Sequence, residues 1–306
     1  MKAFTKKLCL IILALLIFMP GNAIAHLPRL VESDSDFVVI SDPEISQAFY
    51  GELQGMPVEY QITSDREFRL YVGILVPDIP QVRKDISVEI HKMEIGAHET
   101  VALLDGTTFE WTPYYEKFAK DHYFWGPEYK ADDSQKEIKL KGRTVPAGDY
   151  RIGVFSPTNQ GKYCLVIGDV EDFSLKNSLD VLVIPQIKLH FFNESLAGIL
   201  LNYFGWGIIL FFYLSAFIVG LLIREFARIF FKVTPRGLRK NIGPADKLVR
   251  AVIGLGLLVW AITTTWNPVI IFFSGFFFFE AMFSWSVLYM VLNIVTSEIK
   301  LKKPKD

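Results

Sequence analysis

Aromatic side chains are concentrated between residues 109 and 129, where they are interleaved with acidic residues. Rings with a polar tip beside carboxylates suit sugar stacking or a protein contact, because they bury area at a low entropic cost. A second interpretation stays open, in which this stretch is a long connection or lid that its own rings pin to the core. The residues that would form a recognition surface are Trp111, Tyr114, Tyr115, Tyr123 and Trp125.

His26 is a second group with possible chemistry, because cleavage after Ala25 would make it the first residue of the mature chain. Its α-amino group and imidazole could then chelate Cu(II) as a cofactor. A second imidazole would complete a three-nitrogen site, and the alternative is an ordinary exposed N-terminus. The spacing does not select among the other histidines, which are His91, His98, His122 and His190.

Catalytic motifs are absent from the sequence, which has no Gly-x-Ser-x-Gly, His-Glu-x-x-His, Cys-x-x-Cys or phosphate-binding glycine loop. Cys164 lies in an apolar strand pattern that is typical of a small core residue. Asp78, Asp85 and Glu89 could bind calcium, although solvated loop carboxylates are the commoner case. We therefore expect a protein that is not an enzyme.

Glu280 is the one ionisable residue within a long apolar run near the C-terminus. An ionised carboxylate at the middle of a bilayer costs about 3 kcal/mol, so Glu280 should face another helix and bond a polar partner or stay protonated. One interpretation is a path for protons or solutes. The other is a hydrogen bond between helices that fixes packing or a homo-oligomer. The candidate partners are Ser215, Thr263, Ser274 and Ser284.

Charge divides the chain into two parts, although the totals of 32 Lys+Arg and 33 Asp+Glu nearly cancel. Residues 26–195 carry an acidic excess and residues 196–306 a basic excess. With 51% hydrophobic residues and a mean hydropathy of +0.30, this split excludes a single soluble domain, a disordered chain and a nucleic-acid binder with a basic face.

Four apolar segments indicate export and membrane insertion. Residues 1–25 have the lysines, short apolar core and small residues of a cleaved signal peptide. The uncharged run 196–223 is long enough to span a bilayer, and the runs 251–266 and 268–296, separated by a turn at Asn267 and Pro268, form a hairpin. The sequence thus predicts three transmembrane helices, the first at 196–223 and the other two within a hairpin at 248–296.

The basic residues of the connector at 224–247 and of the tail at 297–306 set the orientation. By the positive-inside rule both segments, and with them the C-terminus, are cytoplasmic, so residues 26–195 lie outside. We expect a protein of the bacterial inner membrane. The side chains expected at lipid headgroups are Arg236, Arg239, Lys240, Lys247 and Arg250.

Residues 26–195 contain many short β patterns separated by turn residues. Their density predicts an exported all-β sandwich, similar to a jelly roll, with a β-rich α+β domain as the alternative. Only residues 114–120 have a spacing compatible with a helix. The predicted strands are 37–40, 58–63, 68–76, 86–93, 100–104, 138–140, 150–155 and 162–167.

Parts of the sequence resemble two known protein families. The patterns Phe49-Tyr50-Gly51, Gly148-Asp149-Tyr150 and Gly161-Lys162-Tyr163 resemble those of bacterial pre-peptidase C-terminal β-sandwich modules, which implies an accessory module without an active site. Asn241-Ile242-Gly243, followed by Asp246, Lys247, Arg250 and Gly254, resembles the opening of the YgaP-like two-helix inner-membrane family. The family's cysteine position is Ser286 here, so thiol or persulfide chemistry is not implied.

The combined prediction is a membrane-anchored cell-envelope protein whose exported β-domain binds or scaffolds an envelope protein or glycan. A larger membrane assembly could contain it as a subunit. The alternative is a component of a transport or solute- and metal-sensing system that uses Glu280 and the exported domain. The lipid bilayer is an expected partner, and nucleic acid is not.

Overall fold

The computed structural model describes residues 26–31, 37–117, 119–131, 141–172, 179–230 and 240–297. The chain divides into two compact units, one ending at Glu194 and the other beginning at Ser195. The first unit is β-rich and the second is helical. The predicted signal peptide and the predicted strand at 138–140 lie outside the described residues, as do residues 231–239 of the connector and most of the tail.

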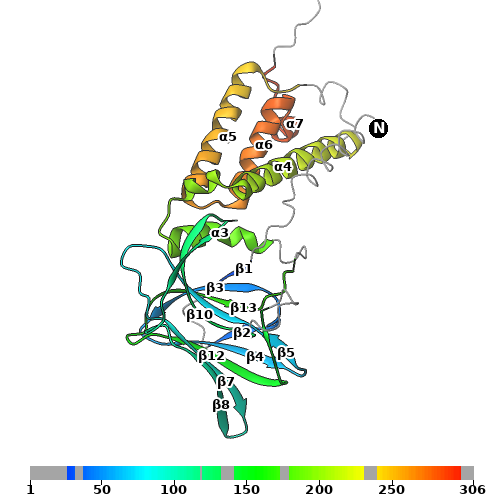
Figure 1. Ribbon diagram of the computed structural model, residues 1–306. Helices are drawn as coiled ribbons and strands as arrows, with labels where there is room; N and C mark the ends of the chain where they lie inside the picture. Colours follow the sequence, from blue (N-terminus) through cyan, green and yellow to red (C-terminus); the bar gives the residue numbers. More distant parts are fainter. Residues whose placement is uncertain are drawn as a thin grey trace, which may run out of the picture. The chain divides into compact units, whose positions relative to one another are not determined.

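Two large sheets and one small sheet make up the β-rich unit (Figure 1). The strand orders are β1-β3-β13-β6-β10-β9, β2-β4-β12-β7-β8, and β11-β5. The strands are β1 (Leu27–Leu30), β2 (Val38–Ile40), β3 (Gln47–Gln54), β4 (Val58–Ser64), β5 (Phe68–Leu70), β6 (Val72–Pro77), β7 (Ser87–Glu94), β8 (Ala97–Leu104), β9 (Thr112–Glu116), β10 (Asp121–Tyr129), β11 (Arg143–Val145), β12 (Gly148–Phe155) and β13 (Gln160–Ile167).

The five-stranded sheet has one buried face and one face that is open to solvent. In β12, Tyr150, Ile152 and Val154 are buried, while Asp149, Arg151 and Gly153 alternate with them on the other face. This period of two is what a strand with a single buried face requires. The buried side chains of this sheet join those of the six-stranded sheet in one apolar cluster, which is the core of the unit.

The six-stranded sheet is covered on its second face by a helical segment. This segment consists of η1 (Leu179–Val183), α3 (Ile184–Gln186) and η2 (Ile187–Phe191). Ile187, Phe191 and the following Phe192 form a second apolar cluster with side chains of the sheet. All six residues of β6 are therefore buried, because its two faces contact different clusters.

A buried ion pair fixes this helical segment to the sheet. The Lys188 ammonium bonds the Asp121 carboxylate of β10, and their side chains are only 5% and 4% exposed. Burial raises the pKa of Asp121 to about 6, against the opposing effect of the nearby Lys188 charge. Glu194 is a second acceptor for Lys188 at 3.3 Å. Lys162 of β13 donates to the carbonyls of His190 and Phe191, which lie at the end of the segment.

Most predicted strands correspond to observed strands, but several observed strands were missed. β1, β3, β9, β10 and β11 have no predicted counterpart. Residues 114–116 belong to β9 and residues 117, 119 and 120 to turns, so the expected helical spacing is wrong there. β3 lacks a clean alternation because residues on both of its faces are buried. β10 contains Gly126 and Pro127, and its register with β6 shifts between Trp125 and Glu128.

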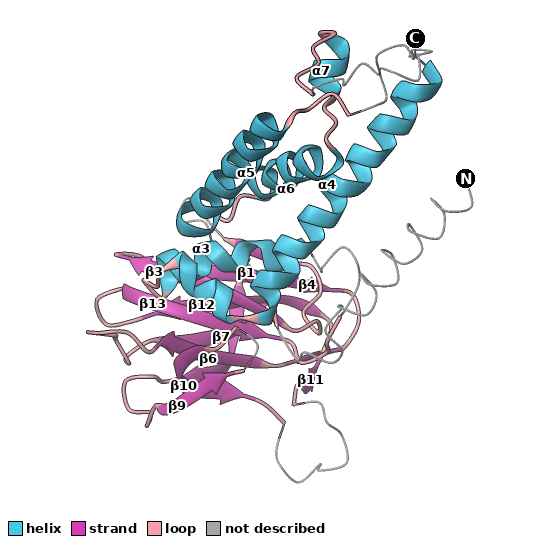
Figure 2. Cartoon of the chain, turned by 90° about the horizontal axis from the view of Figure 1, so that it is seen from above, coloured by secondary structure: helices cyan, strands magenta, loops and turns pink. Residues whose placement is uncertain are grey.

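The second unit contains η3 (Leu196–Leu201), α4 (Tyr203–Phe230), α5 (Pro244–Thr264), α6 (Pro268–Phe283) and α7 (Val287–Val291) (Figure 2). Two of its helices, at Tyr203–Ala227 and Pro244–Thr264, are long and apolar enough to cross a membrane. The 16 residues of α6 extend about 24 Å, which is less than the roughly 30 Å of a hydrocarbon core.

The predicted limits of two apolar runs need correction. The run 196–223 begins with the 3₁₀ turns of η3, and the helix proper starts at Tyr203 and continues past residue 223. The run 268–296 is not one helix, because Ser284 adopts a left-handed φ of 55° and ends α6. The predicted turn is confirmed: the Asn267 side chain accepts a hydrogen bond from the Val269 N–H at 2.8 Å, and Pro268 begins α6.

Small residues allow α6 to approach both long helices. A Cβ at Gly220 of α4 would lie 2.5 Å from the Phe279 ring, and one at Gly254 of α5 would lie 3.1 Å from the Phe278 ring. A Cβ at Gly275 of α6 would meet the Tyr213 backbone at 3.0 Å. Glycine at these positions therefore permits close packing of α6 against its two neighbours.

Replacing Lys188 tests the buried pair of the β-rich unit. In Lys188→Met the Asp121 carboxylate remains buried without its nearest cation, so we expect the free energy of unfolding to fall by about 3–5 kcal/mol. The measurement is denaturant unfolding of the full chain in detergent. The double variant Lys188→Met/Asp121→Asn removes both charges and should recover much of this loss.

The control is Lys130→Met, which removes a half-exposed partner of Glu128 and should cost less than about 1 kcal/mol. A Lys188→Met protein that unfolds at the same denaturant concentration as the wild type would contradict the assigned role of the pair.

Candidate functional site

The Glu280 carboxylate pairs with the Arg250 guanidinium across the α5–α6 hairpin. The two side chains are only 5% and 12% exposed, and the Arg250 guanidinium also lies 4.8 Å from the centre of the Tyr289 ring. Arg250 was expected to reach lipid headgroups, and this expectation needs correction because its charged group is enclosed by its own hairpin. The arrangement neutralises two charges within an apolar pair of helices.

None of the four expected partners of Glu280 has that role. The Ser274 hydroxyl donates to the Gly254 carbonyl at 2.7 Å and lies 2.8 Å from the Tyr213 hydroxyl, so it joins α6 to α5 and α4. Ser215 and Thr263 donate to carbonyls of their own helices. Ser284 ends α6, and its backbone N–H donates to the Glu280 carbonyl. The expected helix contact exists, but through an ion pair.

The chain entering α5 is bound to the chain leaving α6. The Asn241 side chain donates to the Ser286 carbonyl at 2.9 Å and accepts from the Ser286 N–H at 2.8 Å. The Gly243 N–H donates to the Thr296 hydroxyl at 3.0 Å, and a Cβ at Gly243 would lie 2.4 Å from the Thr296 carbonyl oxygen. Asp246 lies in the first turn of α5 and accepts from the Thr296 hydroxyl. These residues therefore close the hairpin at the end opposite Asn267.

The other residues expected at headgroups are only partly described. Lys240 is exposed and Lys247 is half-buried, whereas Arg236 and Arg239 lie outside the described residues. Their contact with lipid stays a prediction.

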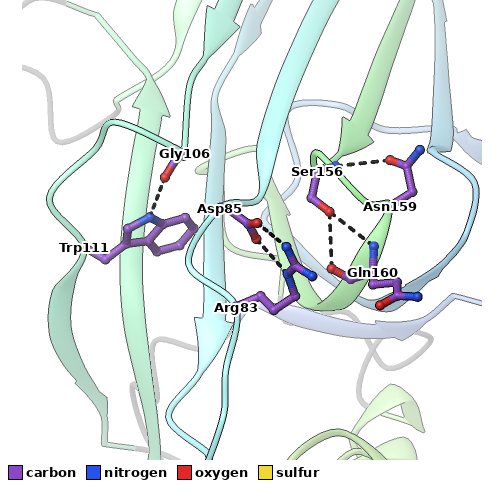
Figure 3. Close-up of polar contacts among 7 residues, drawn as sticks. All are labelled: Arg83, Asp85, Gly106, Trp111, Ser156, Asn159 and Gln160. Atoms are coloured by element: carbon purple, nitrogen blue, oxygen red, sulfur yellow. Dashed lines mark hydrogen bonds and ion pairs between the residues drawn. The ribbon is translucent and has the colours of Figure 1, made fainter.

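Two members of the predicted aromatic surface are structural. The Trp111 indole N–H donates to the Gly106 carbonyl at 2.9 Å (Figure 3), and its ring packs against the core. A Cβ at Gly126 would lie 2.6 Å from that ring. Tyr123 is 4% exposed, and its hydroxyl bonds that of Tyr50 at 3.0 Å. Trp111 and Tyr123 therefore follow the core interpretation of this stretch.

The other three aromatic residues lie at the edge formed by β9 and β10. Tyr114 and Tyr115 are 39% and 44% exposed, and as neighbours in a strand they point to opposite faces. Tyr114 packs edge-on against Trp125 with ring centres 4.9 Å apart, whereas Tyr115 packs against His122. We call the exposed part of Tyr114 and Trp125 the Tyr114–Trp125 surface.

Charged groups border this surface. The Lys141 ammonium lies 5.6 Å from the centre of the Trp125 ring and 5.5 Å from that of Tyr71. The Tyr71 hydroxyl donates to Glu128, and Lys130 contacts the same carboxylate at 2.9 Å. Burial raises the pKa of Glu128, but these two hydrogen bonds outweigh it and hold the pKa below its usual value. The surface therefore combines two rings with both signs of charge.

His26 lies partly buried at the start of β1, and its Nδ1 bonds the Ser46 hydroxyl. Burial, with a smaller effect of the Lys141 charge, lowers the pKa of the imidazole to about 4. Within the described ranges, no three or more His, Cys, Asp or Glu side chains are arranged to hold a metal ion. The predicted copper site at His26 needs only one further histidine, so this absence does not test it and the site stays a prediction.

The remaining candidates for chemistry have structural partners. Asp85 forms an ion pair with Arg83 (Figure 3), and Glu89 contacts the His91 imidazole at 3.2 Å. In the turn between β12 and β13, the Ser156 N–H donates to the Asn159 side chain at 3.2 Å, and the Gln160 N–H at the start of β13 donates to the Ser156 hydroxyl at 3.2 Å. Cys164 is buried, and burial raises the pKa of its thiol well above the usual value, so it is a core residue.

Comparisons with known proteins bear on both resemblances, that of the C-terminal hairpin and that of the β-rich unit. Residues 238–300 match the family described as inner membrane protein YgaP-like, transmembrane domain, which confirms that resemblance for this segment. A pre-peptidase C-terminal domain of a collagenase from Bacillus anthracis is 9% identical, with 48% of this chain and 98% of that chain covered and a TM-score of 0.23. That score carries no argument about the fold. No curated protein matches the chain.

The depressed pKa of His26 predicts a pH dependence of stability. Because the folded pKa of about 4 lies below the ordinary value of 6.5, the unfolded chain binds the proton more tightly. The stabilisation is complete above pH 6.5, is lost progressively as the pH falls from 6.5 to 4, and is absent below pH 4. Between pH 7.5 and pH 5 the wild type should lose about 2 kcal/mol more than His26→Gln, measured by denaturant unfolding.

The matched control is His190→Gln, an exposed position in the same unit, which should keep the wild-type dependence. Equal pH profiles for the wild type and His26→Gln would contradict the burial of a neutral imidazole.

Proposed function

We propose that this protein is a non-enzymatic, membrane-anchored component of the bacterial cell envelope whose β-rich unit binds an envelope protein or glycan. The observation that carries this proposal is the Tyr114–Trp125 surface, in which Tyr114 is 39% exposed at a sheet edge and packs edge-on against the half-buried Trp125. Paired rings beside charged groups bind sugars and protein side chains by stacking, with polar contacts at the rim.

Membrane location is supported by the YgaP-like match and by two helices that are long and apolar enough to span a bilayer. Large apolar side chains are exposed on both helices, including Phe211 and Leu222 of α4 and Val252 and Trp260 of α5. Water would make such surfaces unfavourable, whereas lipid covers them. As part of the proposal, α6 is the third span, the β-rich unit lies outside and the C-terminus is cytoplasmic.

The pairing of Glu280 supports a role in packing. A carboxylate that carries protons or solutes needs access to water or to a second acceptor, whereas Glu280 is 5% exposed and bound to Arg250. No contact among the described residues favours the transport alternative. We therefore retain binding as the proposed function, with the hairpin as its anchor.

Removal of the two rings tests the proposal. The variant Tyr114→Ala/Trp125→Ala should fold but bind its partner about 2 kcal/mol more weakly, which is about 30-fold in Kd, because aromatic anchors dominate such contacts. Full chains in lipid nanodiscs are assayed by interferometry against isolated cell-wall glycans and solubilised envelope proteins.

Tyr115→Ala is the matched control, because this neighbouring tyrosine has similar exposure on the opposite face. Binding that survives in the double variant, or that is lost equally in Tyr115→Ala, would overturn the assignment of the surface.

A further inference from the structure

The solvent-facing side of the five-stranded sheet has a hollow at Gly153. Gly153 of β12 pairs with Glu59 of β4 on one side and with Glu89 of β7 on the other. No atom lies within 4 Å of the position that a Cβ would take at Gly153. A pocket of about 400 Å³ opens here, and its lining includes Gly153, Glu59 and Glu89; we call it the Gly153 hollow.

Two imidazoles also line the Gly153 hollow. His91 Nδ1 lies 3.3 Å from the Thr100 hydroxyl, while His91 Nε2 lies 3.2 Å from a carboxylate oxygen of Glu89. The His98 ring packs edge-on against the His91 ring, with 4.8 Å between ring centres. Two imidazoles and a carboxylate thus lie beside one another on two neighbouring strands, β7 and β8.

We propose that His91, His98 and Glu89 bind one divalent transition-metal ion, with the chemistry of zinc, in the Gly153 hollow. Imidazole and carboxylate form a common donor set for zinc, with water in a remaining position. A ligating histidine is usually oriented by a hydrogen bond at its other ring nitrogen, and Thr100 occupies that position at His91. This inference does not depend on the proposed function.

The three ligands do not surround a common point in the metal-free protein. This agrees with the finding that no three such side chains among the described residues are already placed to hold a metal ion. His98 is exposed on β8, so its ring can change rotamer at little cost and turn a nitrogen towards His91 Nε2. Arg151 also lines the hollow, but it pairs with Glu59 at 3.6 Å, and this contact offsets its repulsion of a cation.

Zinc titration of the full chain tests the site. The protein is purified in nanodiscs without a histidine tag, stripped with a chelator, and titrated with Zn²⁺ by calorimetry. We expect one site, with affinity at least about tenfold weaker in His91→Ala and in His98→Ala. Thr100→Val keeps all three ligands and should weaken binding by about 10–100-fold, because it removes the bond that orients His91.

The control variants are His122→Ala and His190→Ala, which lie outside the hollow and should bind Zn²⁺ as the wild type does. A titration with Cu²⁺ provides a spectroscopic check, since its electron paramagnetic resonance should show coupling to nitrogen that decreases in His98→Ala. Absence of a zinc site, or an affinity equal to that of the wild type in His91→Ala or in His98→Ala, would overturn the proposal. Thermal unfolding confirms that each variant is folded.

Discussion

The helical unit depends on the pairing of Arg250 with Glu280. Either charge alone would cost several kcal/mol in an apolar environment, and a partner that is close and well oriented offsets this cost. Because the two residues belong to successive helices, their contact requires one axial register between α5 and α6. Asn241 and Gly243 bind the segment that follows α6, and Asn267 caps the turn between the helices. The hairpin is thus fixed at both ends and along its length.

The β-rich unit also contains a buried ion pair, between Lys188 and Asp121. There too a buried charge pair joins two elements that are distant in sequence, in this case the segment at 179–191 and strand β10. Apolar contacts of Phe191 and Phe192 supply the buried area, but they specify position less strictly than an ion pair does. With that face of the sheet covered, the β9–β10 edge and the solvent-facing side of the five-stranded sheet are among the surfaces that remain open.

The sequence predicted those parts of the molecule that local patterns determine. Strands such as β12 and β4 alternate because one face is buried, and the turn at Asn267 and Pro268 follows from capping chemistry. β3 and β10 were missed because burial on both faces and a register shift remove the alternation. The partner of Glu280 was also missed. Arg250 and Glu280 are separated from the turn at Asn267 by similar numbers of residues, so a hairpin places them side by side, and this spacing was the available signal. Likewise, spacing alone could not separate the buried Tyr123 from the exposed Tyr114.

The most direct test of the central claim is the energetic coupling between Arg250 and Glu280. Thermal unfolding of full chains in nanodiscs is measured for Arg250→Glu, Glu280→Arg and the exchanged double variant. If the two charges stabilise each other, each single variant brings like charges together and unfolds at a lower temperature, while the exchange recovers most of the loss, with a coupling of at least about 2 kcal/mol. Additive losses in the double variant would contradict the claim that this pair holds the hairpin together.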